Sequence, residues 1–359
     1  MSSRETTSAY QLDYPFEMNW APEPGDPFEV HPNIFWLNMP LPFTLGRINL
    51  WLLRDATGGT ETWTIVDTGM YGDIGKATWN QVFENFLKPE QVERIIVTHF
   101  HPDHLGLAEW LSAKCDAPVL ISRGEFAMYD DIRGRDAETL KPIVENFVDS
   151  IGGNAEQKDA CLMMGTPMQN KSLPKERCIF IDQSFKIRIG EIDWEVVAGN
   201  GHSPEHMCLY AKAEKIFISG DQAIPRISSN VSLFYDSVSE NPMKDWLESC
   251  ERLRDEVSED VLVLPAHQEP FIGLSKRMQK LIDGHSRQLE LVDQGIHSDE
   301  YAGKNAVECS KILFPRKLEK FDSLMAVGET LANLRFLERN DRIIARVDEH
   351  GVIRFYPKH

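Results

Sequence analysis

The chain has 359 residues, 42% of them apolar, and a formal net charge of −18 at pH 7. This length allows a large core and more than one domain. The charge argues against a protein whose main task is to bind nucleic acid, because such binding depends on Lys and Arg side chains that neutralise phosphates. We therefore expect a globular, strongly acidic protein without a nucleic-acid partner.

The cysteines and the N-terminus indicate the compartment. Six cysteines are scattered along the chain and none forms a C-x-x-C pair, which is typical of reduced thiols in the cytoplasm. Residues 1–7 contain no apolar segment that would make a signal peptide. No apolar run approaches the roughly 20 residues that span a bilayer, so we expect a soluble cytoplasmic protein that does not enter a membrane.

The first third of the sequence predicts an irregular arm followed by a layered α/β domain. Residues 1–28 are polar and rich in proline, and Phe16 and Trp20 are the side chains able to hold them against the surface. The residue patterns then predict strands at 34–37, 48–53 and 62–66, a helix at 74–86, a strand that ends at Thr98, and a helix at 105–113. Strands that alternate with helices are typical of an α/β architecture.

Residues 123–177 lack strand alternation and predict a helical insertion, with helices near 124–129, 136–151 and 155–164. The end of the last helix and the residues after it, 161–168, are rich in methionine. Because Met side chains adapt to irregular gaps and to varied ligands, two interpretations stay open. The one we favour is gap filling in a helical core; the other is an apolar lid in which Met164 and Met168 contact a substrate.

Strands resume in the next hundred residues, and helices follow them. The patterns predict strands from 179 and at 185–189, 194–198, 207–210, 216–219 and 261–264, with a helix at 243–257. After residue 276 they predict helices at 276–297, 302–313 and 317–339 and a β-hairpin of 343–347 with 352–356. We therefore divide the chain into an arm (1–28), a catalytic domain (29–275) and a small winged-helix-like domain (276–359). Its last predicted helix carries mixed charge, which favours a structural or dimerising role over DNA reading.

The most informative stretch runs from Thr98 to Gly106, where a buried strand gives way to a helix. Four potential metal ligands fall within six residues, namely His99, His101, Asp103 and His104. A single His near a strand end is usually a packed or surface residue, whereas a cluster of this density at such a junction is hard to explain by chance. Imidazoles and a carboxylate that converge at a strand end suit zinc or a similar divalent ion.

Four further polar residues lie just past predicted strands, namely Asp67, His202, Asp221 and His267. Each alone is a weak signal, because a His after a strand is more often structural. Together with the cluster, the two further histidines and Asp221 make seven ligand-type residues, all at strand ends. Asp67 either caps a turn or orients a ligand imidazole from behind.

This pattern resembles the metallo-β-lactamase superfamily. The resemblance rests on Asp67-Thr68-Gly69, on the segment from Thr98 to Gly106, and on Gly201-His202-Ser203, Ser219-Gly220-Asp221 and Pro265-Ala266-His267. It covers roughly residues 30–275 and implies an αββα sandwich that holds two divalent metals, zinc first, with Mn or Fe as alternatives. By position, one metal would take His99, His101 and His202, the other would take Asp103, His104 and His267, and Asp221 would bridge them.

Within the superfamily, the pattern looks like the glyoxalase II-like and lactamase-beta-2-like branches. The region after residue 276 is similar to the winged-helix tail of the second branch. The resemblance implies a dinuclear hydrolase in which a metal-bound hydroxide attacks a carbonyl or phosphoryl group. Asp103 would be the catalytic residue, because it can orient the hydroxide or move a proton to the leaving group.

The sequence after Asp221 narrows the substrate class. A lactonase of this superfamily would carry a tyrosine shortly after that aspartate, but none occurs before Tyr235, and the net charge argues against a nuclease. Thioester cleavage, as in hydroxyacylglutathione hydrolases, is our first choice, with a lactonase or β-lactamase-like hydrolase as the alternative. Arg226 either grips a substrate carboxylate or lies solvated at the surface. We expect a small-molecule substrate and allow for a homodimer.

A non-enzymatic protein is the second class of hypothesis. It would be a binding or regulatory protein on a retained scaffold, with the C-terminal domain as its working part. Degenerate ligand positions would indicate such a protein. Because all seven ligand positions are filled, we favour the metal-dependent hydrolase.

Overall fold

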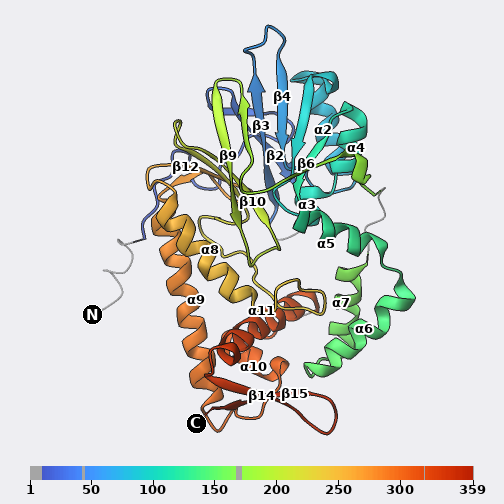
Figure 1. Ribbon diagram of the computed structural model, residues 1–359, viewed down its shortest axis with the longest axis vertical. Helices are drawn as coiled ribbons and strands as arrows, with labels where there is room; N and C mark the ends of the chain where they lie inside the picture. The colour runs from blue at the N-terminus through green and yellow to red at the C-terminus, as the bar shows by residue number, and fades with distance from the viewer. Residues whose placement is uncertain (1–9, 43–44, 167–171, 319, 359) are drawn as a thin grey trace.

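The computed structural model describes residues 10–42, 45–166, 172–318 and 320–358. Its centre is a pair of β-sheets packed face to face, with helices on the outer face of each sheet (Figure 1). Aromatic and aliphatic side chains from both sheets, such as Trp36, Trp51, Met207 and Ile218, fill the space between them. The predicted αββα sandwich is therefore confirmed.

The first sheet has seven strands that lie side by side in chain order. They are β1 (Phe28–His31), β2 (Ile34–Pro40), β3 (Arg47–Asp55), β4 (Thr62–Val66), β5 (Val92–Ile96), β6 (Val119–Ser122) and β7 (Cys178–Ile181). Strands β1 to β4 are antiparallel, and β4 to β7 are parallel. Its outer face is covered by α2 (Asp73–Asn85), α4 (Ala108–Cys115) and α5 (Arg123–Gly134), through Trp79, Leu111 and Phe126.

The second sheet has six strands in the order β13-β12-β11-β10-β9-β8. They are β8 (Lys186–Ile189), β9 (Ile192–Gly199), β10 (His206–Ala211), β11 (Ile216–Gly220), β12 (Leu262–Pro265) and β13 (Phe271–Ile272). All neighbours are antiparallel except β11 and β12, which are joined by helix α8 (Pro242–Glu256). Trp246 on α8 packs with Phe217 on the outer face of this sheet.

The arm and the helical insertion both pack as the apolar pattern suggests. Phe16 and Trp20 of the arm lie against Trp36, with ring centroids 6.0 and 5.5 Å apart. In the insertion, α6 (Ala137–Ser150) and α7 (Ala155–Gly165) form an apolar cluster that also takes in Leu324 of the C-terminal region. The short 3-10 helices η1 (Pro89–Gln91) and η2 (Lys175–Arg177) complete this half of the chain.

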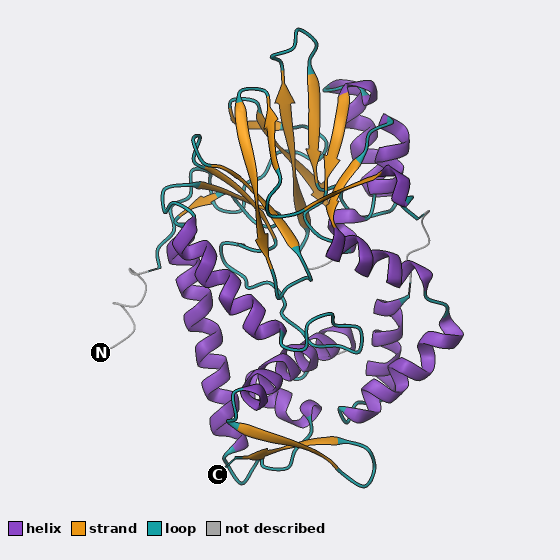
Figure 2. Cartoon of the chain, viewed as in Figure 1, coloured by secondary structure: helices purple, strands orange, loops and turns teal. Residues whose placement is uncertain are grey.

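The C-terminal region consists of three helices followed by a β-hairpin. It is coloured orange to red in Figure 1, and Figure 2 shows its helices in purple and its strands in orange. Its elements are α9 (Leu274–Ile296), α10 (Ala306–Leu313), α11 (Lys320–Arg339), β14 (Ile343–Val347) and β15 (Ile353–Pro357). Helix α10 begins at Ala306, later than predicted, because the Asn305 side chain caps it and accepts a hydrogen bond from the Glu308 amide. One apolar cluster runs from α8 through α9 to α11 and the hairpin. Within the described ranges, no helix combines the length and apolar character needed to cross a bilayer.

Candidate metal centre

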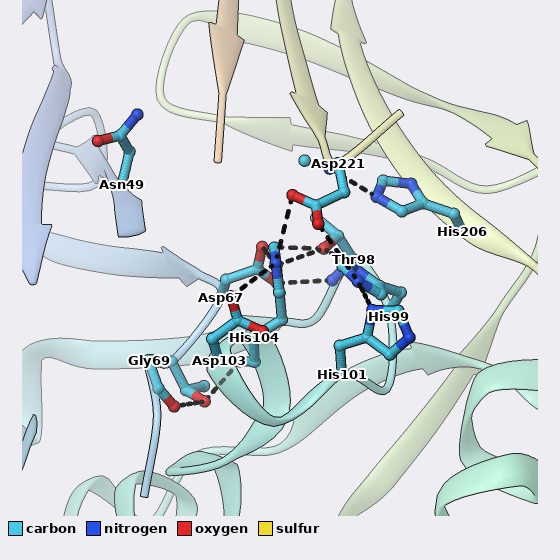
Figure 3. A network of polar contacts seen from close by, with 12 residues as sticks. Asn49, Asp67, Gly69, Thr98, His99, His101, Asp103, His104, His206 and Asp221 are labelled. Carbon is cyan, nitrogen blue, oxygen red and sulfur yellow. Dashed lines mark hydrogen bonds and ion pairs between the residues drawn. The ribbon is translucent and has the colours of Figure 1, made fainter. Parts of the chain in front are cut away.

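The ligand-type residues lie on segments that follow strands. Figure 3 shows five of them close together, namely His99, His101, Asp103, His104 and Asp221. Backbone hydrogen bonds hold these segments together within each sheet and between the two sheets. The Asp67 amide donates to the Ile96 carbonyl at 2.8 Å, the Met207 amide to the Thr98 carbonyl at 2.8 Å, and the Ala266 amide to the Gly220 carbonyl at 3.0 Å. Strands far apart in the sequence therefore present their ends to a common centre.

The turn after β5 is tighter than the sequence suggested. Instead of one helix over 105–113, the structure has α3 (Pro102–Leu105), a break, and α4, so that prediction is wrong in its detail. At the break, Gly106 lies close to the segment after β4: an added Cβ would lie 2.6 Å from the Tyr71 nitrogen and 3.0 Å from the Gly69 carbonyl oxygen. Asp103 and His104 consequently lie within a helical turn, not in an irregular loop.

The seven predicted ligands fall into two groups whose ligand atoms lie within 4.8 Å of one another in each group. One group is His99, His101, His202 and Asp221, and the other is Asp103, His104 and His267. Asp221 faces both. Its Oδ2 lies 3.4 Å from Nε2 of His202, and its Oδ1 lies 3.4 Å from Nε2 of both His104 and His267.

Buried atoms without hydrogen-bond partners point into this centre. Among the described residues they include Nε2 of His104, His202 and His267 and Oδ1 of Asp221. The atoms that face one another stand 3.4 Å apart, too far for good hydrogen bonds. A buried polar atom left unpaired costs about 1–3 kcal/mol, so four of them in one place indicate a ligand that the protein side chains do not supply.

The opposite ring nitrogen of each of these histidines is held by an acceptor. Nδ1 of His104 lies 2.7 Å from Oδ2 of Asp67, that of His202 lies 2.7 Å from the Asn230 carbonyl, and that of His267 lies 3.0 Å from the Arg47 carbonyl. Nδ1 therefore donates and Nε2 faces the centre, which is the arrangement of a metal-binding imidazole once Nε2 carries no proton. Nitrogen and carboxylate donors of this kind fit divalent metals.

The electrostatics of the centre also fit a cation. Burial, and then neighbouring imidazoles, lower the pKa of His99 well below its ordinary value and that of His101 to about 3, so both rings are neutral. At His104 burial lowers the pKa, but the facing carboxylates, first that of Asp67, outweigh burial and raise it well above the ordinary value. A histidine that binds a metal gives up the proton on the binding nitrogen. A divalent ion would therefore replace the positive charge of the protonated His104 ring.

Three buried residues of the centre were not predicted from the sequence. Thr98 donates from Oγ1 to Oδ2 of Asp67 at 2.8 Å. His206 accepts at Nε2 from the Asp221 amide at 3.1 Å, and its ring stacks on His99 at 4.8 Å. Its position beside a predicted strand, four residues after His202, was the available signal.

Glu125, at the start of α5, is the third. It is fully buried and joins two ligand-bearing segments. Its Oε2 accepts from the Phe100 amide at 2.9 Å, and its Oε1 accepts from Ser203 Oγ and the Glu205 amide, both at 2.6 Å. Phe100 lies between His99 and His101, so this carboxylate fixes their segment relative to that of His202.

Replacing Glu125 with Gln should weaken the centre without touching a ligand. The amide offers only one oxygen, so its NH2 group would face the Phe100 amide on one side or the Ser203 and Glu205 donors on the other. We expect metal affinity to fall about 10–100-fold, as for other residues that orient ligands, and the free energy of unfolding to fall by about 1–3 kcal/mol. Chelator competition and denaturant unfolding measure the two effects, with the exposed Glu138→Gln on α6 as the control. Wild-type metal affinity in the Glu125 variant would contradict this role.

The structure describes two of the three predicted substrate-contacting residues, and neither belongs to the ligand groups. Arg226 pairs with the buried Glu269 and lines a cavity. Met164 packs against the apolar cluster of α6, α7 and α11, in the gap-filling manner favoured from the sequence. Met168 lies outside the described residues. Contact of Arg226 or of either methionine with a substrate stays a prediction.

Comparison with known proteins places the chain in a family. Residues 43–267 match the model of the metallo-beta-lactamase superfamily, and residues 298–358 match a metallo-beta-lactamase-like C-terminal domain. A beta-lactamase domain protein from Burkholderia ambifaria is 35% identical with a TM-score of 0.85, covering 97% of this chain and 99% of its own. A metallo-beta-lactamase family protein from Thermus thermophilus is 24% identical with a TM-score of 0.73, covering 92% and 100%, and shares the fold.

A curated relative, the probable metallo-hydrolase YqjP of Bacillus subtilis, is 24% identical over 87% of this chain and 94% of its own length. The family match covers more than half of the chain, and the Burkholderia structure aligns with nearly all of it. The chain therefore belongs to the metallo-beta-lactamase superfamily.

Proposed function

We propose that this chain, a metal-dependent hydrolase of the superfamily, cleaves a thioester or a related ester of a small molecule. The observation that carries the hydrolase assignment is the set of buried, unpartnered imidazole and carboxylate atoms that face one centre. The relative named a probable metallo-hydrolase supports it. The choice of a thioester as the substrate class rests on the residues around the centre.

The chain's own residues have separable tasks in this proposal. His99, His101 and His202 would hold one metal, Asp103, His104 and His267 would hold the other, and Asp221 would face both. When bound, two divalent ions, zinc in the first instance, would supply a nucleophile at neutral pH and polarise the substrate carbonyl. Manganese and iron remain alternatives for the same donors.

Asp103 is the proposed catalytic carboxylate. Its Oδ2 lies 3.4 Å from Nε2 of His267, and its side chain is 17% exposed, against 11% for Asp221. It is therefore the carboxylate of the centre more open to a substrate. We propose that it takes up a proton from the attacking water and passes that proton to the departing sulfur or oxygen.

Two features favour a thioester over lactones and nucleic acids. The first tyrosine after Asp221 is Tyr235, and its hydroxyl accepts a hydrogen bond from Arg135 Nη1 at 3.0 Å. That hydroxyl lies so near α7 that a Cβ on Gly165 would be 2.2 Å from it, which disfavours a lactonase role. The net charge of −18 disfavours a nuclease.

The C-terminal region and the compartment complete the proposal. Three helices followed by a hairpin support a winged-helix-like unit with a structural or dimerising role. The six cysteines have unpaired thiols, in keeping with the cytoplasmic location expected from the sequence.

A substrate screen with the metal-loaded protein tests the proposal. We expect elemental analysis to give about two metals per chain, as a two-metal site requires, and turnover of thioesters above lactones, β-lactams and phosphodiesters. His101→Ala should lower kcat by about 10³-fold, the several kcal/mol that metals contribute to the transition state. His350→Ala, at an exposed histidine of the hairpin, should leave it unchanged. Turnover of another class alone would reject the thioester, and no metal after remetallation would reject the enzyme.

A further inference from the structure

A polar cavity of about 490 Å³ lies beside the metal centre. Its polar lining is Asn19, Asn38, Arg47, Arg226, Gln268 and Glu269. Two of its lining residues, Gln268 and Glu269, follow the ligand-type residue His267 in the sequence, and the Arg47 carbonyl lies 3.0 Å from Nδ1 of that histidine. A cavity of this volume is within the range of small-molecule sites.

Two arginines flank one carboxylate in this cavity. Glu269 has no exposed surface, and its Oε1 accepts from Arg47 Nη2 at 3.2 Å and from the Asn19 amide at 2.7 Å. Its Oε2 pairs with Arg226 Nη1. The two arginine side chains keep 23% and 31% of their surface exposed and line the cavity, whereas the carboxylate between them has no exposed surface.

The group therefore carries a surplus of one positive charge within a chain of net charge −18. Burial lowers the pKa of Arg47, Glu269 raises it, and the charge of Arg226 lowers it again. The two guanidinium groups thus repel each other and share a single carboxylate. A second carboxylate placed in the cavity would balance the charge.

We propose that Arg47 and Arg226 form a carboxylate-binding subsite, so that the substrate is a thioester that also bears a free carboxylate. Planar guanidinium groups suit this ligand because they donate two parallel hydrogen bonds to a carboxylate. Glu269 acts as a positioning residue that holds both arginines toward the cavity. This inference rests on the proposed function and names the substrate class of the same site.

A purely structural role is the competing explanation. Arg47 also donates to the carbonyls of Asn19 and Trp20, both at 3.3 Å, and so ties the arm to the sandwich. The Arg226 amide donates to Gln268 Oε1 at 3.0 Å and ties its loop to the same place. Hydrogen bonds with a purely structural role would affect stability but not the preference among substrates, so a test must measure substrate preference.

The test uses matched thioesters on the metal-loaded protein. One pair carries a carboxylate or its methyl ester on the acyl part, and a second pair carries them on the thiol part. We expect wild type to prefer the carboxylate in one pair, as a ratio of kcat/KM. Arg226→Gln should lower this preference about tenfold or more, mainly through KM, because the subsite is remote from the reacting carbonyl. Arg226→Lys should lower the preference less, because lysine keeps the positive charge but cannot donate the two parallel hydrogen bonds of a guanidinium group.

Arg188→Gln is the matched control. Arg188 lies on β8 in an exposed ion pair with Asp193, so its loss should leave the preference unchanged. Equal kcat/KM for both members of each pair in wild type, or an unchanged preference in Arg226→Gln, would overturn the subsite.

If the chain is not a thioesterase, the result is different, because neither member of any pair is turned over. Calorimetric titration of the metal-loaded protein with glutarate tests the subsite even in that case. Weaker binding to Arg226→Gln than to Arg188→Gln supports it, and equal binding overturns it.

Discussion

Replacing Asp221 with Asn is expected to empty the centre of most of its metal and to lower kcat by about 10³-fold or more. The reason is that its two carboxylate oxygens are divided between the two groups of ligands. Oδ2 lies 3.4 Å from Nε2 of His202, while Oδ1 lies 3.4 Å from Nε2 of His104 and of His267. Asparagine offers one oxygen and an NH2 group that cannot bind a cation. In either orientation of the amide, one of the two sets of ligands therefore loses the oxygen that Asp221 provides.

The charge of Asp221 contributes as much as its geometry. Burial raises the pKa of this carboxyl, but His267 and His104 outweigh burial and hold it well below its ordinary value. The side chain therefore stays ionised and would supply a full negative charge between the two proposed cations. The amide removes that charge, so we expect metal affinity to fall more than the 10–100-fold that loss of an orienting residue costs.

Elemental analysis and chelator competition measure the loss of metal, and kcat on the best ester measures the loss of activity. Asp193→Asn on β9 is the matched control, because the Asp193 side chain is 74% exposed and pairs only across the surface with Arg188. A variant Asp221→Asn that keeps two metals at wild-type affinity would refute the bridging position. Near-ultraviolet circular dichroism should match wild type, which separates loss of metal from loss of fold.

The sequence predicted those ligand residues that directly follow a recognisable strand. Strands of a layered domain deliver the residues that follow them to a sheet edge, and this rule picked out His202, Asp221 and His267 although they lie far from the cluster. The apolar alternation around them is what made the strand ends recognisable. The structure brings all three to the cluster at His99.

The rest of the centre depends on partners that carry no sequence signal. The acceptors for His202 and His267 are backbone carbonyls, which every residue has, so nothing marked Asn230 or Arg47. Glu125 looked like any acidic residue in the first turn of a helix, and only tertiary packing buries it. The close approach of Gly106 to the segment after β4 likewise depends on tertiary packing.

Asp67→Asn is the second substitution with a large expected effect, and it changes no ligand. Asp67 has φ of 61°, a left-handed conformation that Asn tolerates as well as Asp, so the backbone should not be strained. Its Oδ1 accepts from the Thr98 amide at 2.8 Å, and its Oδ2 accepts from Thr98 Oγ1 at 2.8 Å and lies 2.7 Å from Nδ1 of His104. An amide cannot accept on both sides, so its NH2 group must face a donor.

If the NH2 group faces His104, that ring loses the acceptor that fixes its tautomer and orientation. We then expect metal affinity to fall about 10–100-fold and kcat to fall with it. If it faces the Thr98 amide, a buried donor loses its partner and the free energy of unfolding falls by about 1–3 kcal/mol. Chelator competition and denaturant unfolding of the metal-free protein distinguish the two. Asp116→Asn is the control, because Asp116 also has a left-handed φ, 51°, but its side chain is 92% exposed. Unchanged affinity and stability together would mean that Asp67 does not orient His104.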